Sequence, residues 1–309
     1  MIKADAYNHG AEGVAYIANN IVDRFGVATI EEALMLRKLG ITKPISIFGC
    51  TLSDLDIIKQ YSITPVVYNL DLLKIVLLKD FQEFDLKIDS GMRRFGIYSE
   101  QDVLYAKRMC EKYNVVPRAI HTHFMSSAKI DEQIFNYNKI IASWDSSSKR
   151  ILSASTGVLK KHFYDGVRVG LLAYKEALEI TSKVVEVKTV KAGEEVGYDG
   201  DFVSEKDTNV AIVLGGYYDG IKRAYKGACV KINNEYFKIV GKTSMDTMFV
   251  EIGDAPVAIN DDVVVLSNDT INSFIKASNT NEYEMLVSIK GRSKRIYEYN
   301  GKEISAFTY

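Results

Sequence analysis

Cysteine is scarce in this sequence, with three residues in 309, and so are proline, with four, and tryptophan, with one. Cys50, Cys110 and Cys229 are odd in number and far apart, so the spacing indicates neither a disulfide framework nor a cysteine zinc site. No apolar run approaches the roughly 20 residues that span a bilayer, and nothing resembles a signal peptide. We therefore expect reduced thiols, no metal centre, no membrane partner and a cytoplasmic location.

The sequence also lacks an excess of either charge, because 39 Lys and Arg residues face 40 Asp and Glu residues. Phosphate-binding surfaces usually show a clustered basic excess, so we expect no nucleic-acid partner. What the chain does contain is 47% hydrophobic residues. At this length they can bury a large core, and we expect about two domains.

The first half alternates short apolar runs with helical patterns. Thr29-Ile30-Glu31-Glu32 is a capping box for a helix over residues 31–39, which Gly40 ends, and further helices are expected at 71–79 and 101–113. Strands are expected at eight places, namely 2–4, 25–28, 44–49, 64–68, 84–89, 119–124, 151–155 and 167–172. Eight parallel strands with outer helices predict a TIM (β/α)8 barrel, whose chemistry lies at the C-terminal ends of the strands.

Beyond about residue 180 the pattern changes to that of β-structure. Residues 185–188 alternate in polarity, 209–214 form an apolar run, and 229–240 break at Asn233-Asn234 as a hairpin does. We expect an N-terminal barrel over residues 1–180 and a mostly β domain over 181–309.

Polar side chains follow the ends of several predicted strands: Lys3, Arg94, His121, His123, Ser155 and Arg168. In a barrel these ends converge, and a desolvated lysine there can act as a base or form a Schiff base. Each residue also has a plain alternative. Lys3 could be a surface charge, His123 a hydrogen-bonded core residue, and Ser155 a helix N-cap, although a helix N-terminus is itself a phosphate cradle.

Seven motifs then follow one another in a known order. Lys3 opens KADAYNHG, which resembles the pyridoxal-phosphate lysine motif of alanine racemases, commonly KADAYGHG. The others are LKIDSGMRRFG (86–96), HTHF (121–124), VRVGLLAY (167–174), GEEVGYDGDF (193–202), GYYDG (216–220) and SMD (244–246). Seven ordered motifs are a strong signal where one is weak, so the chain is identified as a member of the alanine racemase family.

This resemblance implies that pyridoxal 5'-phosphate is the cofactor and alanine the substrate. It makes Lys3 the Schiff-base lysine and one acid/base group, and Tyr198 the opposing one. Implied cofactor contacts are Tyr7, His123, Ser155, Arg168, Gly170, Leu171 and Tyr283. Implied substrate contacts are Arg94, Met245 and Asp246. Lys87 matches a lysine that is carbamylated in many members.

The resemblance further implies a homodimer with composite active sites, because the tyrosine at the Tyr198 position and the Met-Asp segment reach the partner's barrel in the family. D-Alanine made in this way would feed peptidoglycan synthesis. Asn8 departs from the motif glycine, Ser244 replaces a cysteine, and Arg93 adds bulk beside Arg94. Family members carry a longer segment before the lysine, so the first barrel strand is expected to be truncated and an upstream segment is expected to exist.

Other functions stay open at this point. A broad-specificity racemase acting on serine is one, because an extra atom or two changes binding by only about 1–3 kcal/mol. A non-catalytic pyridoxal-phosphate-binding protein is another, although that class normally lacks the β domain and its Tyr198-like residue. A scaffold that binds no cofactor is the third.

Overall fold

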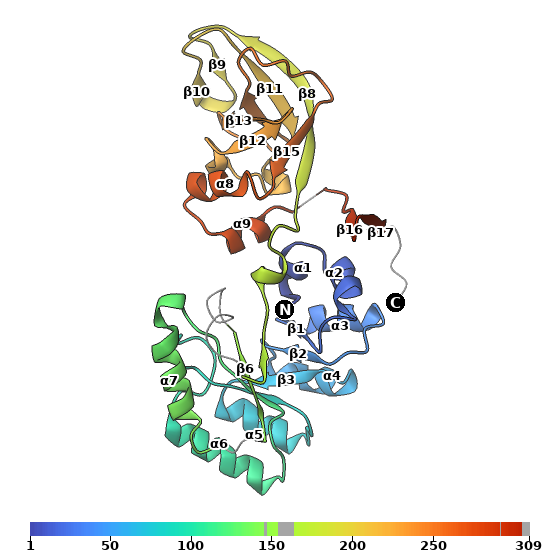
Figure 1. Ribbon diagram of the computed structural model, residues 1–309, viewed down its shortest axis with the longest axis vertical. Coiled ribbons are helices and arrows are strands. Elements are labelled where there is room, and N and C mark those ends of the chain that lie inside the picture. The colour runs from blue at the N-terminus through green and yellow to red at the C-terminus, as the bar shows by residue number, and fades with distance from the viewer. Residues whose placement is uncertain (145–146, 154–163, 291, 305–309) are drawn as a thin grey trace. The chain divides into compact units, whose positions relative to one another are not determined.

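The computed structural model describes residues 1–144, 147–153, 164–290 and 292–304 (Figure 1). The chain forms two compact units: the first comprises Met1–Ala6, Gly10–Ala173 and Tyr297–Tyr309, and the second comprises Tyr7–His9 and Tyr174–Ile296. The division at residues 180 and 181 stays a prediction.

The first unit is built on a parallel sheet of seven strands in the order β1-β2-β3-β4-β5-β6-β7. Its strands are β1 (Phe25–Val27), β2 (Ile45–Ile47), β3 (Thr64–Val67), β4 (Asp85–Lys87), β5 (Ala119–His121), β6 (Lys149–Leu152) and β7 (Gly166–Val167). Every residue of β1 to β5 is buried, as expected for parallel strands covered on both faces.

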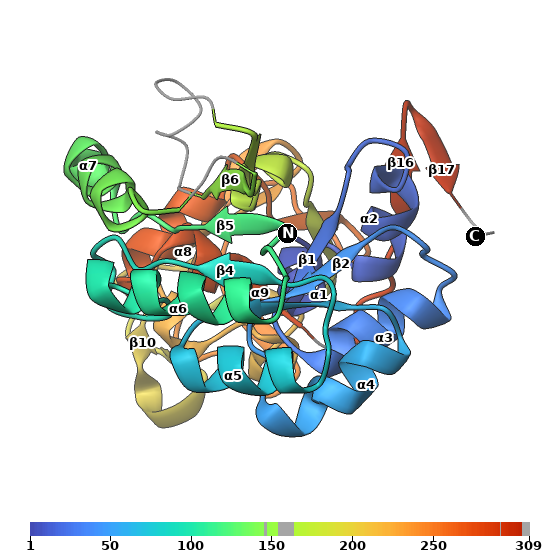
Figure 2. The ribbon, with the colours of Figure 1, turned by 90° about the horizontal axis from the view of Figure 1, so that it is seen from below.

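Helices and short turns connect these strands. They are α2 (Ala11–Ala18), α3 (Ile30–Lys38), η1 (Leu52–Asp54), α4 (Leu55–Gln60), α5 (Leu70–Leu78), α6 (Glu100–Lys112), η2 (Ser127–Lys129), α7 (Ile130–Ile140) and η4 (Leu171–Ala173). Figure 2 shows α4, α5 and α6 following one another around the outside of the curled sheet. A C-terminal hairpin, β16 (Tyr297–Tyr299) with β17 (Lys302–Ile304), also belongs to this unit.

Most of the sequence prediction for this unit is confirmed. Seven expected strands and the helices at 71–79 and 101–113 form within a few residues of the expected positions, and α3 begins at the predicted capping box. The expected strand at residues 2–4 is wrong. Residues Lys3–Tyr7 instead form α1, a tight turn in which Ala4, Asp5 and Ala6 have φ between 53° and 55°.

Met1 and Ile2 lie at the place where an eighth strand would run. The Ile2 N–H donates to the Gly26 carbonyl of β1 at 2.9 Å, and the Met1 nitrogen donates to the Val169 carbonyl, just past β7, at 2.8 Å. The two outer ends of the sheet are thus bridged by two residues. This leaves Lys3 as the first residue past the bridge.

The second unit contains a closed barrel of six antiparallel strands in the order β11-β14-β13-β12-β15-β8. They are β8 (Ile180–Val190), β11 (Thr208–Leu214), β12 (Cys229–Ile232), β13 (Glu235–Val240), β14 (Thr247–Glu251) and β15 (Asp262–Leu266). The 11-residue strand β8 pairs with both β11 and β15 and so closes the barrel. The predicted hairpin is confirmed: Asn233 and Asn234, both at positive φ, join β12 to β13.

Shorter elements complete this unit: the strand pair β9 (Glu195–Val196) and β10 (Phe202–Val203), the turns η5 (Tyr198–Gly200), η6 (Tyr217–Asp219) and η7 (Arg223–Tyr225), and the helices α8 (Ile271–Ser278) and α9 (Glu282–Ser288). In the part of the chain that the structure describes, no helix is long and apolar enough to cross a membrane.

Candidate active site

The residues on both sides of Lys3 are bonded to the same strand–helix unit, β1 and α3. Ile2 donates to Gly26 of β1, and the Ala4 N–H donates to the Glu32 carboxylate of α3 at 2.7 Å. Burial lowers the pKa of the Lys3 amine, the charges of Arg94 and Arg168 lower it further, and the charge of Glu32 raises it. The net shift is downward, so the neutral amine, which is the form that acts as a nucleophile or base, is easier to reach than in a solvent-exposed lysine.

The turn after Lys3 has an uncommon backbone. Five consecutive residues, Ala4 to Asn8, have φ between 53° and 69°, the left-handed region that costs an L-residue roughly 1–2 kcal/mol. The Ala6 N–H donates to the Ile2 carbonyl at 3.0 Å, and the Asp5 carboxylate accepts the Ala11 N–H at 2.8 Å. Such strained backbone occurs mainly at functional sites, where surrounding contacts hold it.

Arg94 lies in a loop that starts at the C-terminal end of β4. The loop closes on itself because the Asp89 N–H donates to the Ile97 carbonyl at 2.9 Å. The Asp89 carboxylate also accepts the backbone N–H of Gly91 at 2.8 Å and of Arg94 at 3.0 Å. Gly96, at φ 131°, packs so closely on the backbone of residues 87–89 that a Cβ there would overlap it. The loop is therefore built to hold Arg94 in a defined place.

Arg168 follows β7 and contacts residues just past the ends of β5 and β2. Its guanidinium donates through Nη2 to the Thr122 carbonyl at 2.8 Å and lies 4.5 Å from the centre of the Phe48 ring. His123, just past β5, shares a hydrogen bond of 3.0 Å between its Nδ1 and the Ser153 hydroxyl. Burial and then the charges of Arg168, Lys87, Arg94 and Lys3 lower the pKa of His123 to about 3, so its ring is neutral at pH 7.

Lys87, the last residue of β4, is buried, and its Nζ donates to the Ile88 carbonyl at 3.1 Å. Burial lowers its pKa well below the usual value, and the charge of Arg168 acts in the same direction. A neutral lysine amine is the form that carbamylation requires.

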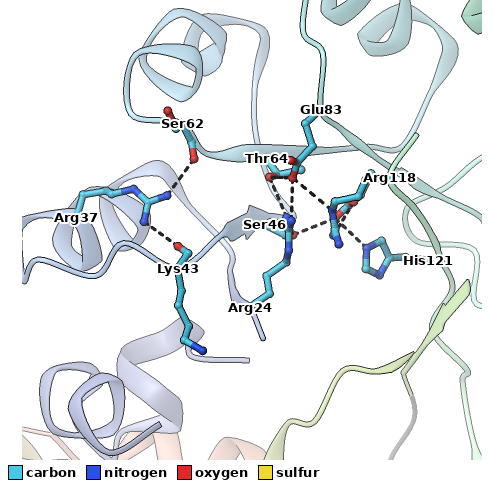
Figure 3. Close-up of polar contacts among 10 residues, drawn as sticks. Arg24, Arg37, Lys43, Ser46, Ser62, Thr64, Glu83, Arg118 and His121 are labelled. Atoms are coloured by element: carbon cyan, nitrogen blue, oxygen red, sulfur yellow. Dashed lines mark hydrogen bonds and ion pairs between the residues drawn. The ribbon is translucent and has the colours of Figure 1, made fainter. Parts of the chain in front are cut away.

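A polar network in the first unit surrounds Asp85, the first residue of β4. Figure 3 labels its members Ser46, Arg118 and His121. The buried Asp85 carboxylate accepts from Arg118 at 2.8 Å, from Ser46 at 2.9 Å and from His121 Nε2 at 3.0 Å. Arg24, Thr64 and Glu83 extend the network, with Arg24 and Glu83 forming an ion pair of 2.8 Å. Burial lowers the pKa of His121 to about 4, so it is neutral at pH 7 and donates its Nε2 proton to Asp85. His121, a candidate at the sequence level, thus belongs to this network.

In the second unit, Tyr7 belongs to an aromatic cluster. Its ring centre lies 5.1 Å from that of Tyr174 and 6.2 Å from that of Tyr283, while the His9 ring lies 4.9 Å from Tyr174. Tyr283 is in the first turn of α9, whose N-cap residue Asn281 accepts the Glu284 N–H at 3.0 Å. Two of the predicted cofactor contacts, Tyr7 and Tyr283, are therefore brought together.

Asn8 ties this cluster to the other end of α9. Its Nδ2 donates to the carbonyls of Leu286, at 2.9 Å, and Ile289, and its Oδ1 accepts from Arg295 at 3.3 Å. Asparagine tolerates the left-handed conformation that Asn8 adopts, so it can replace the motif glycine and add these bonds.

Met245 and Asp246 lie in a turn against the segment 216–220. Gly215 donates to the Asp246 carbonyl at 2.8 Å, and a Cβ on Gly216 would overlap the Met245 carbonyl. The Ser244 hydroxyl, which replaces the usual thiol, donates to the Thr247 carbonyl at 2.9 Å and closes the turn.

The Asp246 carboxylate pairs with Arg292 at 2.9 Å, and Arg292 also pairs with Asp219 at 2.7 Å. All three residues line a cavity of about 340 Å³ in the second unit. The side chains of Met245 and of Tyr198 in η5 are both exposed, at 52% and 58%.

The structure thus groups the predicted residues within each unit. Lys3, Arg94, His123 and Arg168 interact electrostatically in the first, and Gly170 and Leu171 follow Arg168 at half-buried positions. Ser155 lies outside the described residues. The sequence did not reveal the contacts of Glu32, Tyr174 and Arg292. Glu32 had a local signal as part of the capping box and Tyr174 as the last residue of the motif VRVGLLAY, whereas Arg292 had none.

Comparison with known proteins gives the family. Residues 1–177 match the model of the alanine racemase N-terminal domain, and residues 177–297 match that of the alanine racemase C-terminal domain. The chain is 33% identical over 320 residues to the alanine racemase of Actinobacillus succinogenes, which covers 94% of this chain and 89% of that protein. The chain belongs to the alanine racemase family.

Solved structures of alanine racemases share its fold. That of Clostridium difficile 630 aligns with a TM-score of 0.90 at 28% identity, over 98% of this chain and 89% of that one. That of Bartonella henselae, which has covalently bound pyridoxal phosphate, aligns with a TM-score of 0.87 at 22% identity, over 96% and 91% of the two chains. The predicted alanine racemase architecture, a barrel domain followed by a mostly β domain, is confirmed.

Proposed function

We propose that this alanine racemase family member interconverts L-alanine and D-alanine with pyridoxal 5'-phosphate, and that Lys3 is the residue that binds the cofactor. The observation that carries the proposal is the environment of Lys3: a half-buried amine of lowered pKa between two arginines at the strand ends of a parallel sheet. Relatives that are named alanine racemases over most of this chain support the substrate.

The residues of the first unit fit this cofactor. Arg94 and Arg168 place positive charge at the strand ends, Lys3 supplies an amine of lowered pKa, and the nearby His123 is neutral. A site of this charge suits a phosphorylated cofactor and a substrate carboxylate. When bound, pyridoxal phosphate withdraws electrons from the substrate α-carbon and so acidifies its proton.

Racemisation requires a proton to leave one face of the α-carbon and another to arrive on the opposite face, so two acid/base groups are needed. We assign these roles to the Lys3 Nζ and the Tyr198 hydroxyl. Arg94 binds the substrate carboxylate, for which a planar guanidinium is suited, and Met245 and Asp246 contact the substrate.

Arg168 faces the pyridine nitrogen in this proposal. A guanidinium keeps its proton, so it donates a hydrogen bond without protonating the ring, and the ring withdraws fewer electrons. From the family resemblance, His123 would lie beside the cofactor ring. The same resemblance assigns the phosphate to Tyr7, Tyr283 and Ser155 and to the backbone at Gly170 and Leu171, which would hold it.

We further propose that the active form is a homodimer. Tyr198 and Met245 are both more than half exposed, so their side chains are accessible to a second copy of the chain. Contribution of these two residues to the barrel of a second copy would give two composite sites. The free cysteines support a cytoplasmic location, where the D-alanine would supply peptidoglycan synthesis.

The test is racemisation of L-alanine and of D-alanine, followed by circular dichroism, together with uptake of solvent deuterium at the α-carbon. Lys3→Ala should abolish both directions and the visible absorbance of the bound cofactor. Tyr198→Phe should abolish racemisation and keep the absorbance. Unchanged turnover in both directions with Tyr198→Phe would show that the two-base assignment is wrong, and no turnover by the purified chain would favour a non-catalytic cofactor-binding protein.

A further inference from the structure

Glu32 connects Lys3 to the strand and helix beside it. One carboxylate oxygen, Oε1, accepts the N–H of Ala4, the residue directly after Lys3, at 2.7 Å. The other, Oε2, accepts the N–H of Ala28 at 2.7 Å and that of Thr29 at 3.4 Å, where β1 ends and α3 begins. The carboxylate therefore joins the turn after Lys3 to the C-terminal end of β1.

The bond to Ala4 is placed where the backbone changes direction. Ala4 is the first of the five left-handed residues, and the residue on the other side of Lys3, Ile2, is bonded to Gly26 of β1. Lys3 is thus the one residue between two anchor points on the same strand–helix unit. Loss of the Glu32 anchor would loosen the backbone directly after Lys3, where only the Ala6–Ile2 and Ala11–Asp5 bonds would remain, and leave the N-terminal side fixed.

Glu32 is also the acidic side chain that acts on the Lys3 amine. The charged groups that shift the pKa of that amine are Arg94 from the loop after β4, Glu32 from α3 and Arg168 from the segment after β7. Two cations thus face one anion. The Met1 amine also interacts with Lys3, but burial, Arg168 and Lys3 lower its own pKa to about 6. Burial and the two arginines lower the pKa of Lys3, and Glu32 opposes them.

We propose that Glu32 is a positioning residue for Lys3, which fixes the backbone beside the cofactor-binding amine through Ala4 and balances the positive charge of Arg94 and Arg168. The proposal rests on the proposed role of Lys3. It goes beyond the capping of α3, because a capping box needs only the bond to residue 29, and a glutamine at this position can supply it.

The chain offers a matched set of variants. Glu32→Gln removes the charge and one acceptor oxygen and keeps the capping box, while Glu32→Asp keeps the charge and shortens the side chain. Glu31→Gln makes the same charge change at the neighbouring exposed position and is the control.

The first measurement uses the cofactor-free protein. Labelling of Lys3 by acetic anhydride is followed against pH by peptide mass spectrometry. Glu32→Gln should move the midpoint of labelling to lower pH, because an attractive charge is lost while two repulsive ones remain. Glu31→Gln should leave the midpoint unchanged, and Glu32→Asp should lie close to the parent protein.

The second measurement is pyridoxal phosphate binding and alanine turnover. Loss of a hydrogen bond to a charged group should weaken cofactor binding and lower kcat in Glu32→Gln by about tenfold or more, with a smaller change in KM. If only thermal stability falls, while the labelling midpoint, cofactor affinity and kcat stay as in the parent, Glu32 is a helix cap and the proposal is wrong. If Glu32→Gln does not fold, weaker cofactor binding by Glu32→Asp supports the proposal and unchanged binding overturns it.

Failure of the proposed function is recognised separately. It is marked by a Lys3→Ala protein that still binds the cofactor and racemises alanine. The pH midpoint of Lys3 labelling does not depend on that result.

Discussion

Asp89 holds Arg94 in place by accepting its backbone N–H at 3.0 Å, with the second carboxylate oxygen occupied by the Gly91 N–H at 2.8 Å. Since both oxygens are used, Asp89→Asn would turn an amide NH₂ toward one of these donors. We expect KM for alanine to rise about tenfold, as Arg94 loses its defined place. Asp56→Asn, at an exposed position, is the control and should leave steady-state kinetics unchanged. An unaltered KM for Asp89→Asn would show that Asp89 does not fix the position of Arg94.

Arg168→Lys should lower the affinity for the cofactor and allow transamination as a side reaction. The guanidinium donates to the Thr122 carbonyl and packs on Phe48, and an ammonium cannot reproduce this arrangement. We expect about a tenfold weaker affinity, measured by fluorescence titration with pyridoxal phosphate. An ammonium can also release a proton, so slow transfer of the alanine amino group to the cofactor should appear, giving pyridoxamine phosphate and one equivalent of pyruvate. Arg108→Lys, at an exposed position of α6, should change neither the cofactor affinity nor the formation of pyridoxamine phosphate. If Arg168→Lys and Arg108→Lys behave alike, Arg168 does not contact the cofactor.

Asn8→Gly should destabilise the protein even though it restores the motif residue. Glycine adopts the φ of 69° freely, so the loss comes from the bonds to Leu286 and Ile289 and should be about 1–2 kcal/mol. Asn8→Ala should lose roughly 1 kcal/mol more, because alanine is strained there. Urea unfolding measures both values. Asn114, at φ 52° and exposed after α6, is the control, since Asn114→Gly loses no such bonds. An Asn8→Gly protein as stable as its parent would show that these bonds add nothing.

Stability should fall in mild acid because of two buried histidines. Burial, the first cause in both cases, lowers the pKa of His121 to about 4 and that of His123 to about 3 from an ordinary 6.5. Below pH 6.5 the unfolded chain therefore binds protons that the folded chain does not, so the free energy of unfolding decreases as the pH falls from 6.5 toward 4. His121 alone accounts for at most about 3 kcal/mol.

Urea unfolding at several pH values tests this dependence. The His121→Gln variant should show a shallower loss of stability between about pH 7 and about pH 4 than the parent, whatever its stability at neutral pH. Parallel curves for the two proteins would mean that His121 is protonated in the folded state at mildly acidic pH.

The strands that the sequence predicts correctly are those whose local signals are redundant. β1, β2 and β3 are mainly apolar runs of the length of a buried strand, and helix signals such as the capping box before α3 separate them. β4 carries Asp85 and Lys87, and the flanking apolar residues Phe84 and Ile88 indicate this strand.

Residues 2–4 gave a wrong strand because Ile2-Lys3-Ala4 fits a strand end equally well. The left-handed turn that replaces it is held by the bond that the Ala4 N–H donates to the Glu32 carboxylate, a contact that no local pattern contains.

In the candidate site, too, some features could be predicted from the sequence and others could not. Lys3, Arg94 and Arg168 could be predicted because strand ends of a barrel converge, and the motifs name them. The contact of Ala4 with Glu32 spans 28 residues of sequence, and that of Asn8 with Leu286 spans 278. Neither follows a periodicity, so only the folded chain reveals which side chains hold the lysine segment.

The most direct test of the central claim is to locate the covalently bound cofactor. The purified chain is incubated with pyridoxal 5'-phosphate, reduced with borohydride, digested and mapped by mass spectrometry. The account predicts a single major phosphopyridoxyl group on Lys3 and its absence in Lys3→Ala. Labelling of another lysine in the native chain, or no stable labelling, would contradict it.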